Sequence, residues 1–130
     1  MNQSLPQEVL DQLAQEILHF DNAPAAFFKA WKQGAEIAGA EWFGDGSRDG
    51  LQSATSKWHL RPDLLRLNDA MGVLSGGQRM FLSAMVSFYN AQEGGAMLRR
   101  CQFEGLADLG GLDLERRKVI ANLLLHYNGW

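Results

Sequence analysis

Residues 74–89, LSGGQRMFLSAMVSFY, form the most apolar stretch of the 130-residue chain. From Met80 to Tyr89 the apolar side chains nearly encircle a helical wheel, which is the pattern of a helix buried on all sides. The residues before them supply a helix start, because Ser75 can cap the first turn and Gln78, three residues later, can reach back to the cap. We therefore expect a central buried helix that begins after Ser75.

Helical patterns also extend outward from this stretch in both directions. Pro24 suits the first turn of a helix, so the amphipathic N-terminal region reads as two helices rather than one. No segment alternates polar and apolar residues over a useful length, as a half-buried strand would. The sequence therefore predicts an all-α protein, a compact helical bundle of about five to seven helices in a single domain over residues 1–130. The expected helices span about 6–19, 22–43, a short segment after Pro62, 76–89 with its apolar run from Met80 to Tyr89, 96–103 and 114–127.

Small side chains recur at every fourth position of the expected second helix. Ala26, Ala30, Gly34 and Ala38 lie in one row between the large apolar residues. Such a row lets another helix approach closely, so we interpret it as a packing surface.

Residues 44–57, GDGSRDGLQSATSK, are rich in glycine, serine and aspartate and predict a flexible loop. Asp45, Ser47 and Asp49 have the oxygen spacing of the first half of a calcium loop, but Ser56 stands where the closing Glu is needed. We therefore predict no metal and no other cofactor. These three residues are kept only as an alternative cation site.

Two late segments, residues 64–90 and 104–128, are similar when offset by 38 positions. The offset aligns leucine with leucine, Ser with Asp as helix caps, arginine with arginine and Tyr-Asn with Tyr-Asn. Two related helix-loop-helix units packed as a pair are the simplest interpretation. The aligned pairs are Leu74 with Leu112, Ser75 with Asp113, Arg79 with Arg117, and Tyr89-Asn90 with Tyr127-Asn128.

The spacing of Gly72, Leu74, Ser75 and Gln78 resembles the second half of an EF-hand loop. The resemblance implies a degenerate pair of EF-hand-like units, because Gln78 in one copy and Arg116 in the other replace the bidentate Glu that calcium requires. An unrelated helical repeat is the alternative.

Residues 74–78, LSGGQ, also spell the signature of ABC-type ATPases. A nucleotide-binding domain of that family needs a phosphate loop of the form GxxxxGK[ST], which the chain lacks. The capping-box interpretation of Ser75 and Gln78 is therefore preferred.

Composition narrows the classes of function. With 12 Lys and Arg against 15 Asp and Glu, the chain lacks the positive charge that phosphate neutralisation requires, so we expect no nucleic-acid partner. No apolar run approaches the ~18 residues of a membrane span, so we expect no membrane partner. Cys101 is the single cysteine, which excludes an intrachain disulfide and suits a reducing compartment. A cytoplasmic protein of bacterial type is expected.

The charge is divided unevenly along the chain. Residues 1–65 hold five basic and nine acidic side chains, whereas residues 66–130 hold seven and six. This polarity suits self-association or an acidic protein partner, and an ordinary solvated surface is the alternative. The candidate interaction residues are Arg99, Arg100, Arg116, Arg117, Lys118 and Trp130.

No nucleophile constellation, metal cluster or phosphate loop is recognisable. A protein-interaction or regulatory module without catalytic activity is therefore the preferred function. The alternative is a small-molecule-binding protein or small enzyme with an aromatic-rich pocket near Trp42, Trp58 and His59, to which Trp31 would also contribute.

Overall fold

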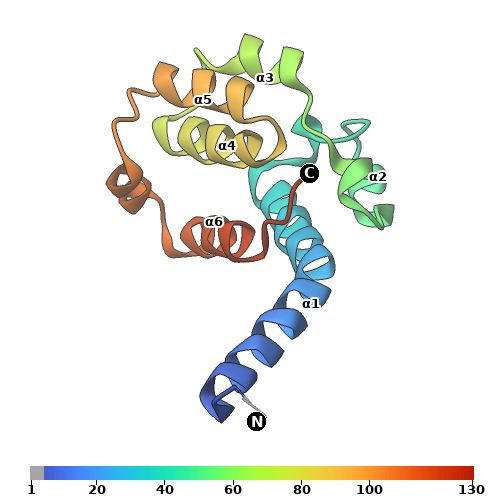
Figure 1. The fold of residues 1–130 in the computed structure, drawn as a ribbon. Coiled ribbons are helices and arrows are strands. Elements are labelled where there is room, and N and C mark those ends of the chain that lie inside the picture. The colour runs from blue at the N-terminus through green and yellow to red at the C-terminus, as the bar shows by residue number, and fades with distance from the viewer. Residues whose placement is uncertain (1–4) are drawn as a thin grey trace.

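The computed structural model describes residues 5–130, and these residues fold into α-helices joined by short 3-10 helices (Figure 1). The all-α bundle predicted from the sequence is confirmed. Within the described residues, the only β pairing is a single bridge between Phe43 and Pro62. The elements in order are α1 (Gln7–Ala38), η1 (Ala40–Trp42), α2 (Arg48–Ser53), η2 (Lys57–Leu60), α3 (Leu64–Ala70), α4 (Gly76–Tyr89), α5 (Ala91–Arg100), η3 (Leu106–Gly111) and α6 (Leu114–His126).

Helix α1 runs unbroken through Pro24, so the prediction of two helices at 6–19 and 22–43 was wrong. Pro24 cannot donate a hydrogen bond to the carbonyl of Phe20, which weakens the helix at that turn. The apolar stripe nevertheless keeps its spacing on both sides of the proline, and Phe27 and Trp31, which follow it, are buried in the core. At 32 residues, α1 is about 48 Å long.

The N-terminal half of α1 projects from the rest of the molecule (Figure 1). Its C-terminal half lies against α6, while α3, α4 and α5 form the opposite side of the bundle. We call residues 7–22 of α1 the arm and the remaining described residues from Ala23 onward the body.

Helix α4 is the central buried helix that the sequence predicts. Ser75 accepts a hydrogen bond from the backbone N–H of Gln78, and the Gln78 side chain accepts one from the backbone N–H of Ser75, which completes the capping box. All six residues from Phe81 to Val86 are buried. The core therefore forms around α4.

Close helix packing depends on small side chains. Gly34, in the predicted row of small residues, lies where an added Cβ would stand 3.0 Å from Val119 of α6 and 2.7 Å from Met85 of α4. Gly94 of α5 lies directly against the backbone of Ser87 in α4. The prediction that the row on α1 admits another helix is confirmed at Gly34.

Two segments expected to be irregular contain helices. Residues 48–53 form α2 inside the predicted loop at 44–57, because Ser47 caps this short helix by accepting from the N–H of Gly50. Helix α5 begins at Ala91 rather than at residue 96, because Asn90 caps it by accepting from the N–H of Glu93. In both segments a side-chain cap starts the helix, although the composition of the segment predicted irregular structure.

The two aligned segments share local structure where α4 and α6 begin. Arg79 donates to the carbonyl of Leu74 at 2.9 Å, and the aligned Arg117 donates to the carbonyl of Leu112 at 2.8 Å. However, α4 packs mainly against α5 and α6 mainly against α1. The EF-hand-like pairing stays a prediction.

None of the helices within residues 5–130 combines the length and the apolar character needed to cross a membrane.

Candidate functional site

Of the four residues predicted to bind a small molecule, two lie in the core. The Trp31 side chain is fully buried, and its indole N–H donates to the carbonyl of Leu60 at 2.8 Å. Trp42 is also buried. These two rings therefore serve packing and do not line an open pocket.

Trp58 and His59 do line a cleft, of about 440 Å³, beside the segment that contains Asp45. The Nδ1 atom of His59 accepts a hydrogen bond from the N–H of Thr55 at 3.2 Å, which in a neutral ring leaves the proton on Nε2. The cleft is open, and most of its lining is polar. Its other lining residues are Gly44, Arg61, Pro62, Asp63 and Tyr89. The predicted small-molecule site thus retains Trp58 and His59, without an enclosed apolar pocket.

The candidate cation residues make hydrogen bonds within the loop and at the start of α2. The Asp45 carboxylate accepts hydrogen bonds from both the hydroxyl and the backbone N–H of Ser47, and these bonds lower the pKa of Asp45. Ser47 in turn caps α2, and Asp49 lies in the first turn of that helix. Within residues 5–130, no group of three or more His, Cys, Asp or Glu side chains is placed to hold a metal ion.

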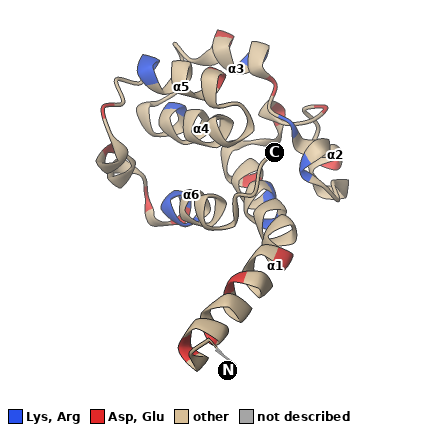
Figure 2. Ribbon diagram, in the orientation of Figure 1, with Lys and Arg blue, Asp and Glu red and all other residues tan. Residues whose placement is uncertain are grey.

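The predicted interaction residues are dispersed. Arg100 donates to Asn68 at 3.2 Å, Arg116 pairs with Asp113, and Arg117 donates to the carbonyls of Leu112 and Gly110. Arg99 and Lys118 are exposed. Figure 2 shows the basic residues on separate helices, with α4 between α5 and α6 in this view. They do not form one continuous basic surface.

Trp130 lies in an aromatic cluster of its own chain. Its ring centroid is 4.7 Å from that of Trp31 and 4.9 Å from that of Tyr89, both with edge-to-face geometry. The Lys57 ammonium stands 5.2 Å from the Trp130 centroid and donates to the carbonyl of Gly129 at 2.8 Å. Desolvation beside these rings lowers the pKa of Lys57. The structure therefore separates Trp130 from the basic residues with which it was grouped.

The largest group of exposed apolar side chains on α1 lies in the arm. Five side chains lie within about 100° of one another around the helix, and each is 38–62% exposed. The same face is buried about two turns further along, where Phe27 and Trp31 are 2% and 0% exposed. We call these five residues the arm stripe: Val9, Leu10, Leu13, Ile17 and Phe20.

The arm is also acidic. Residues 1–28 contain Glu8, Asp11, Glu16 and Asp21 but no Lys or Arg. In Figure 2 the projecting part of α1 accordingly carries red ribbon and no blue. Glu16 and Asp21 border the arm stripe, whereas Glu8 and Asp11 lie on the opposite side of the helix.

The arm joins the body at the end of α6. The Nε2 atom of His19 lies 2.8 Å from the carbonyl oxygen of Leu125, and the His19 ring stacks on His126 with centroids 5.1 Å apart. A cleft of about 480 Å³ opens there between Gln12, Gln15, Glu16, His19 and Phe20 of the arm and Leu125 of α6. These contacts fix the direction in which the arm leaves the body.

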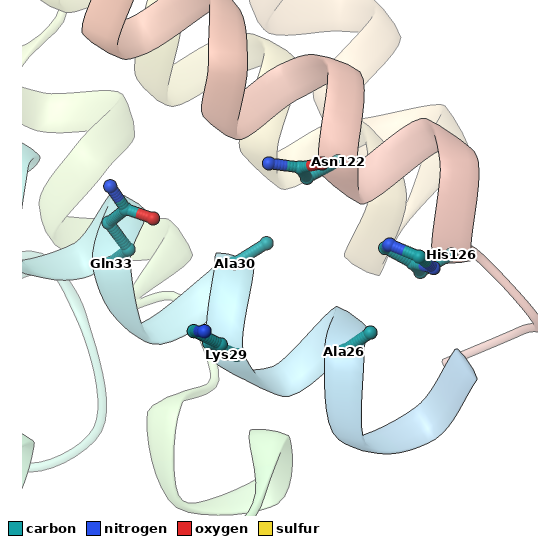
Figure 3. Close-up of a pocket in the computed structure, with 6 residues that line it drawn as sticks. All are labelled: Ala26, Lys29, Ala30, Gln33, Asn122 and His126. Carbon is teal, nitrogen blue, oxygen red and sulfur yellow. The ribbon is translucent and has the colours of Figure 1, made fainter. Parts of the chain in front are cut away.

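A second groove lies between α1 and α6 further into the body, with a volume of about 320 Å³. Figure 3 shows Ala26 and Ala30 of α1 facing α6, from which Asn122 and His126 project. Lys29 and Gln33 complete its lining. The small alanines that allow the two helices to pack also leave this shallow space, so the groove is a consequence of helix packing.

Comparison of the chain with protein-family models, with curated proteins and with solved structures finds no match in any of the three.

The arm stripe is the functional candidate that the sequence analysis did not identify. Its periodicity was visible, but an amphipathic stripe ordinarily predicts burial against the chain's own core. The signal that could have distinguished it is the absence of any Lys or Arg before Lys29. An arm whose charged residues are all acidic indicates a surface suited to a basic partner.

Proposed function

We propose that the protein is a protein-interaction module and that the arm stripe is its docking surface. The observation that supports this proposal is the change in exposure along one face of α1, from a buried Trp31 to an Ile17 that is 62% exposed. A helix of this kind left in water gains nothing from its apolar face, whereas laying that face into a partner removes it from water.

The open cleft beside His59 supports a catalytic function less well than the arm stripe supports a binding function. Its histidine accepts from a backbone N–H, and Asp45, which lies beside it in the same cleft, is engaged by Ser47. Binding through the arm is therefore the preferred function.

The test uses a double substitution in the arm stripe, Leu13→Glu with Ile17→Glu. Both side chains are exposed, so the body should fold as in the wild type. Leu65→Glu is the matched control, because Leu65 is 76% exposed on α3 and lies outside the arm. The immobilised chains would be used to capture partners from the native host, and each captured protein would then be purified and titrated against all three chains.

A partner that binds the wild type and the Leu65→Glu control, but binds the arm variant at least tenfold more weakly, supports the proposal. Equal affinity of every partner for all three chains contradicts it.

A further inference from the structure

We propose that the arm stripe docks on a second copy of this chain, with the arm of each copy packed across the outer face of α6 in the other. This inference rests on the proposed function, because it names the partner of the same docking surface. Three observations support it: the two faces of α6, the charges on the two surfaces, and the apolar area that a single copy leaves uncovered.

Helix α6 is apolar on both of its faces. Val119, Ile120 and Leu123 are buried against the body. On the other side Leu114, Leu124 and Leu125 are 59–68% exposed. A helix with leucines on both sides is expected to have neighbours on both sides. We call the uncovered side, formed by Leu114, Arg117, Lys118, Leu124 and Leu125, the outer face of α6.

The charges of the arm and the outer face are complementary. The arm stripe is bordered by the carboxylates of Glu16 and Asp21, whereas the outer face of α6 carries Arg117 and Lys118. Opposite potentials favour and steer such an encounter, and like charges oppose it. Pairing of two arms with each other would instead bring carboxylates together. The arm therefore suits α6 of a second copy better than it suits a second arm.

The two surfaces are continuous in each copy and large enough for a stable contact. They meet at the cleft where His19 and Phe20 of the arm approach Leu125. The five stripe residues and the three outer leucines expose roughly 800 Å² of apolar side chain, comparable with the ~800 Å² that each partner buries in a standard interface. An exchange of arms buries the arm stripe and the outer face of α6 in both copies. No docking surface is then left for a third chain, so the assembly is a closed dimer.

The molar mass of the full chain, measured by light scattering during size exclusion over a range of concentrations, tests the inference. The wild type is expected to reach twice its 14.5 kDa chain mass. Ile17→Glu in the arm and Leu125→Glu on α6 are each expected to give the mass of one chain, while the control Leu65→Glu remains a dimer. Circular dichroism confirms that every variant retains its helices.

Charge reversal separates arm exchange from pairing of the arms. In an exchange, Glu16→Lys with Asp21→Lys raises the dimer dissociation constant about fivefold or more, and so does Lys118→Glu, while combining the two restores part of the affinity. In a pairing of arms, the arm reversal would instead tighten the dimer and Lys118→Glu would have no effect.

A wild type with the mass of one chain at every concentration overturns the inference, as does a dimer that survives Ile17→Glu or Leu125→Glu, or that tightens on arm reversal. A monomer that still binds another protein through the arm stripe overturns this inference while leaving the proposed function intact.

Discussion

Gly94 shows how one missing methyl group sets the distance between two helices. A Cβ at this position would clash with the backbone of Ser87 in α4, which cannot move aside as a side chain can. The neighbouring Gly95 has open space, with Arg99 Nη1 the nearest atom at 3.7 Å from an added Cβ.

Gly94→Ala is therefore expected to lower the free energy of unfolding by about 3 kcal/mol, the upper part of the range for overpacking. Gly95→Ala is expected to raise it by ~0.5–1 kcal/mol, because alanine loses less backbone entropy in a helix. Urea unfolding measures both values. Equal stabilities for the two variants would show that α5 does not approach α4 this closely.

Trp130 is the second residue whose contribution can be measured alone. Its indole packs on Trp31 and Tyr89, so Trp130→Ala should remove about 2 kcal/mol of stability, less than a fully buried Trp because the ring is partly exposed. Thermal unfolding and the near-ultraviolet dichroism of the tryptophans report the loss. A variant that melts with the wild type would place this ring outside the cluster.

At the scale of the helices, the caps of α4 and α6 allow a matched comparison. Ser75 begins α4 with a neutral hydroxyl, while Asp113 begins α6 with a carboxylate that accepts from the N–H of Arg116. That backbone bond, together with the Arg116 side chain, lowers the pKa of Asp113 in the folded chain.

The two caps should therefore differ in their dependence on pH. Ser75→Ala is expected to cost ~1 kcal/mol at any pH. The stabilisation from Asp113 is complete above the ordinary pKa of an aspartate and is lost as the pH falls through the lowered folded value. Asp113→Ala should consequently destabilise the protein more at about pH 7 than at an acidic pH below the ordinary pKa of an aspartate.

Urea unfolding of both variants at the two pH values measures these costs. A cost of Asp113→Ala that did not shrink in acid would contradict the role of the carboxylate.

The helices could be predicted where the decisive interactions are local. The capping box of Ser75 and Gln78 and the buried run from Phe81 to Val86 depend on neighbours in sequence, and both are confirmed. The continuity of α1 could not be predicted, because Asn22 and Pro24 resemble a helix start. Local sequence signals do not distinguish a helix start at these residues from a helix that passes through them, as α1 does.

At the scale of the whole molecule, the fold separates an acidic arm from a body with basic residues on α6. The division of charge between the two halves of the sequence already indicates this polarity and suggests self-association. The exposure of the arm stripe could not be predicted, because the spacing of Leu13, Ile17 and Phe20 is the same whether a helix packs on its own core or on another chain. The structure distinguishes the two cases, because α1 is longer than α6 and its N-terminal half projects from the body.

The predicted sites depended on which residues the fold would gather. Trp58 and His59 lie together because they are neighbours in η2. Trp31 and Trp42 are instead drawn into the core, and the basic residues of α5 and α6 lie on separate helices. Such long-range groupings depend on tertiary packing, which composition and spacing do not specify.

Amide hydrogen exchange of the full chain at low and high protein concentration tests the central claim most directly. A solitary arm that meets the body mainly at its base, around His19 and Phe20, should exchange rapidly, because short isolated helices are marginal in water. We predict that the amides of residues 7–22 and of α6 become slower at high concentration, while those of α2 and α3 do not change. Arm amides that exchange equally fast at both concentrations would contradict docking of the arm on a second copy.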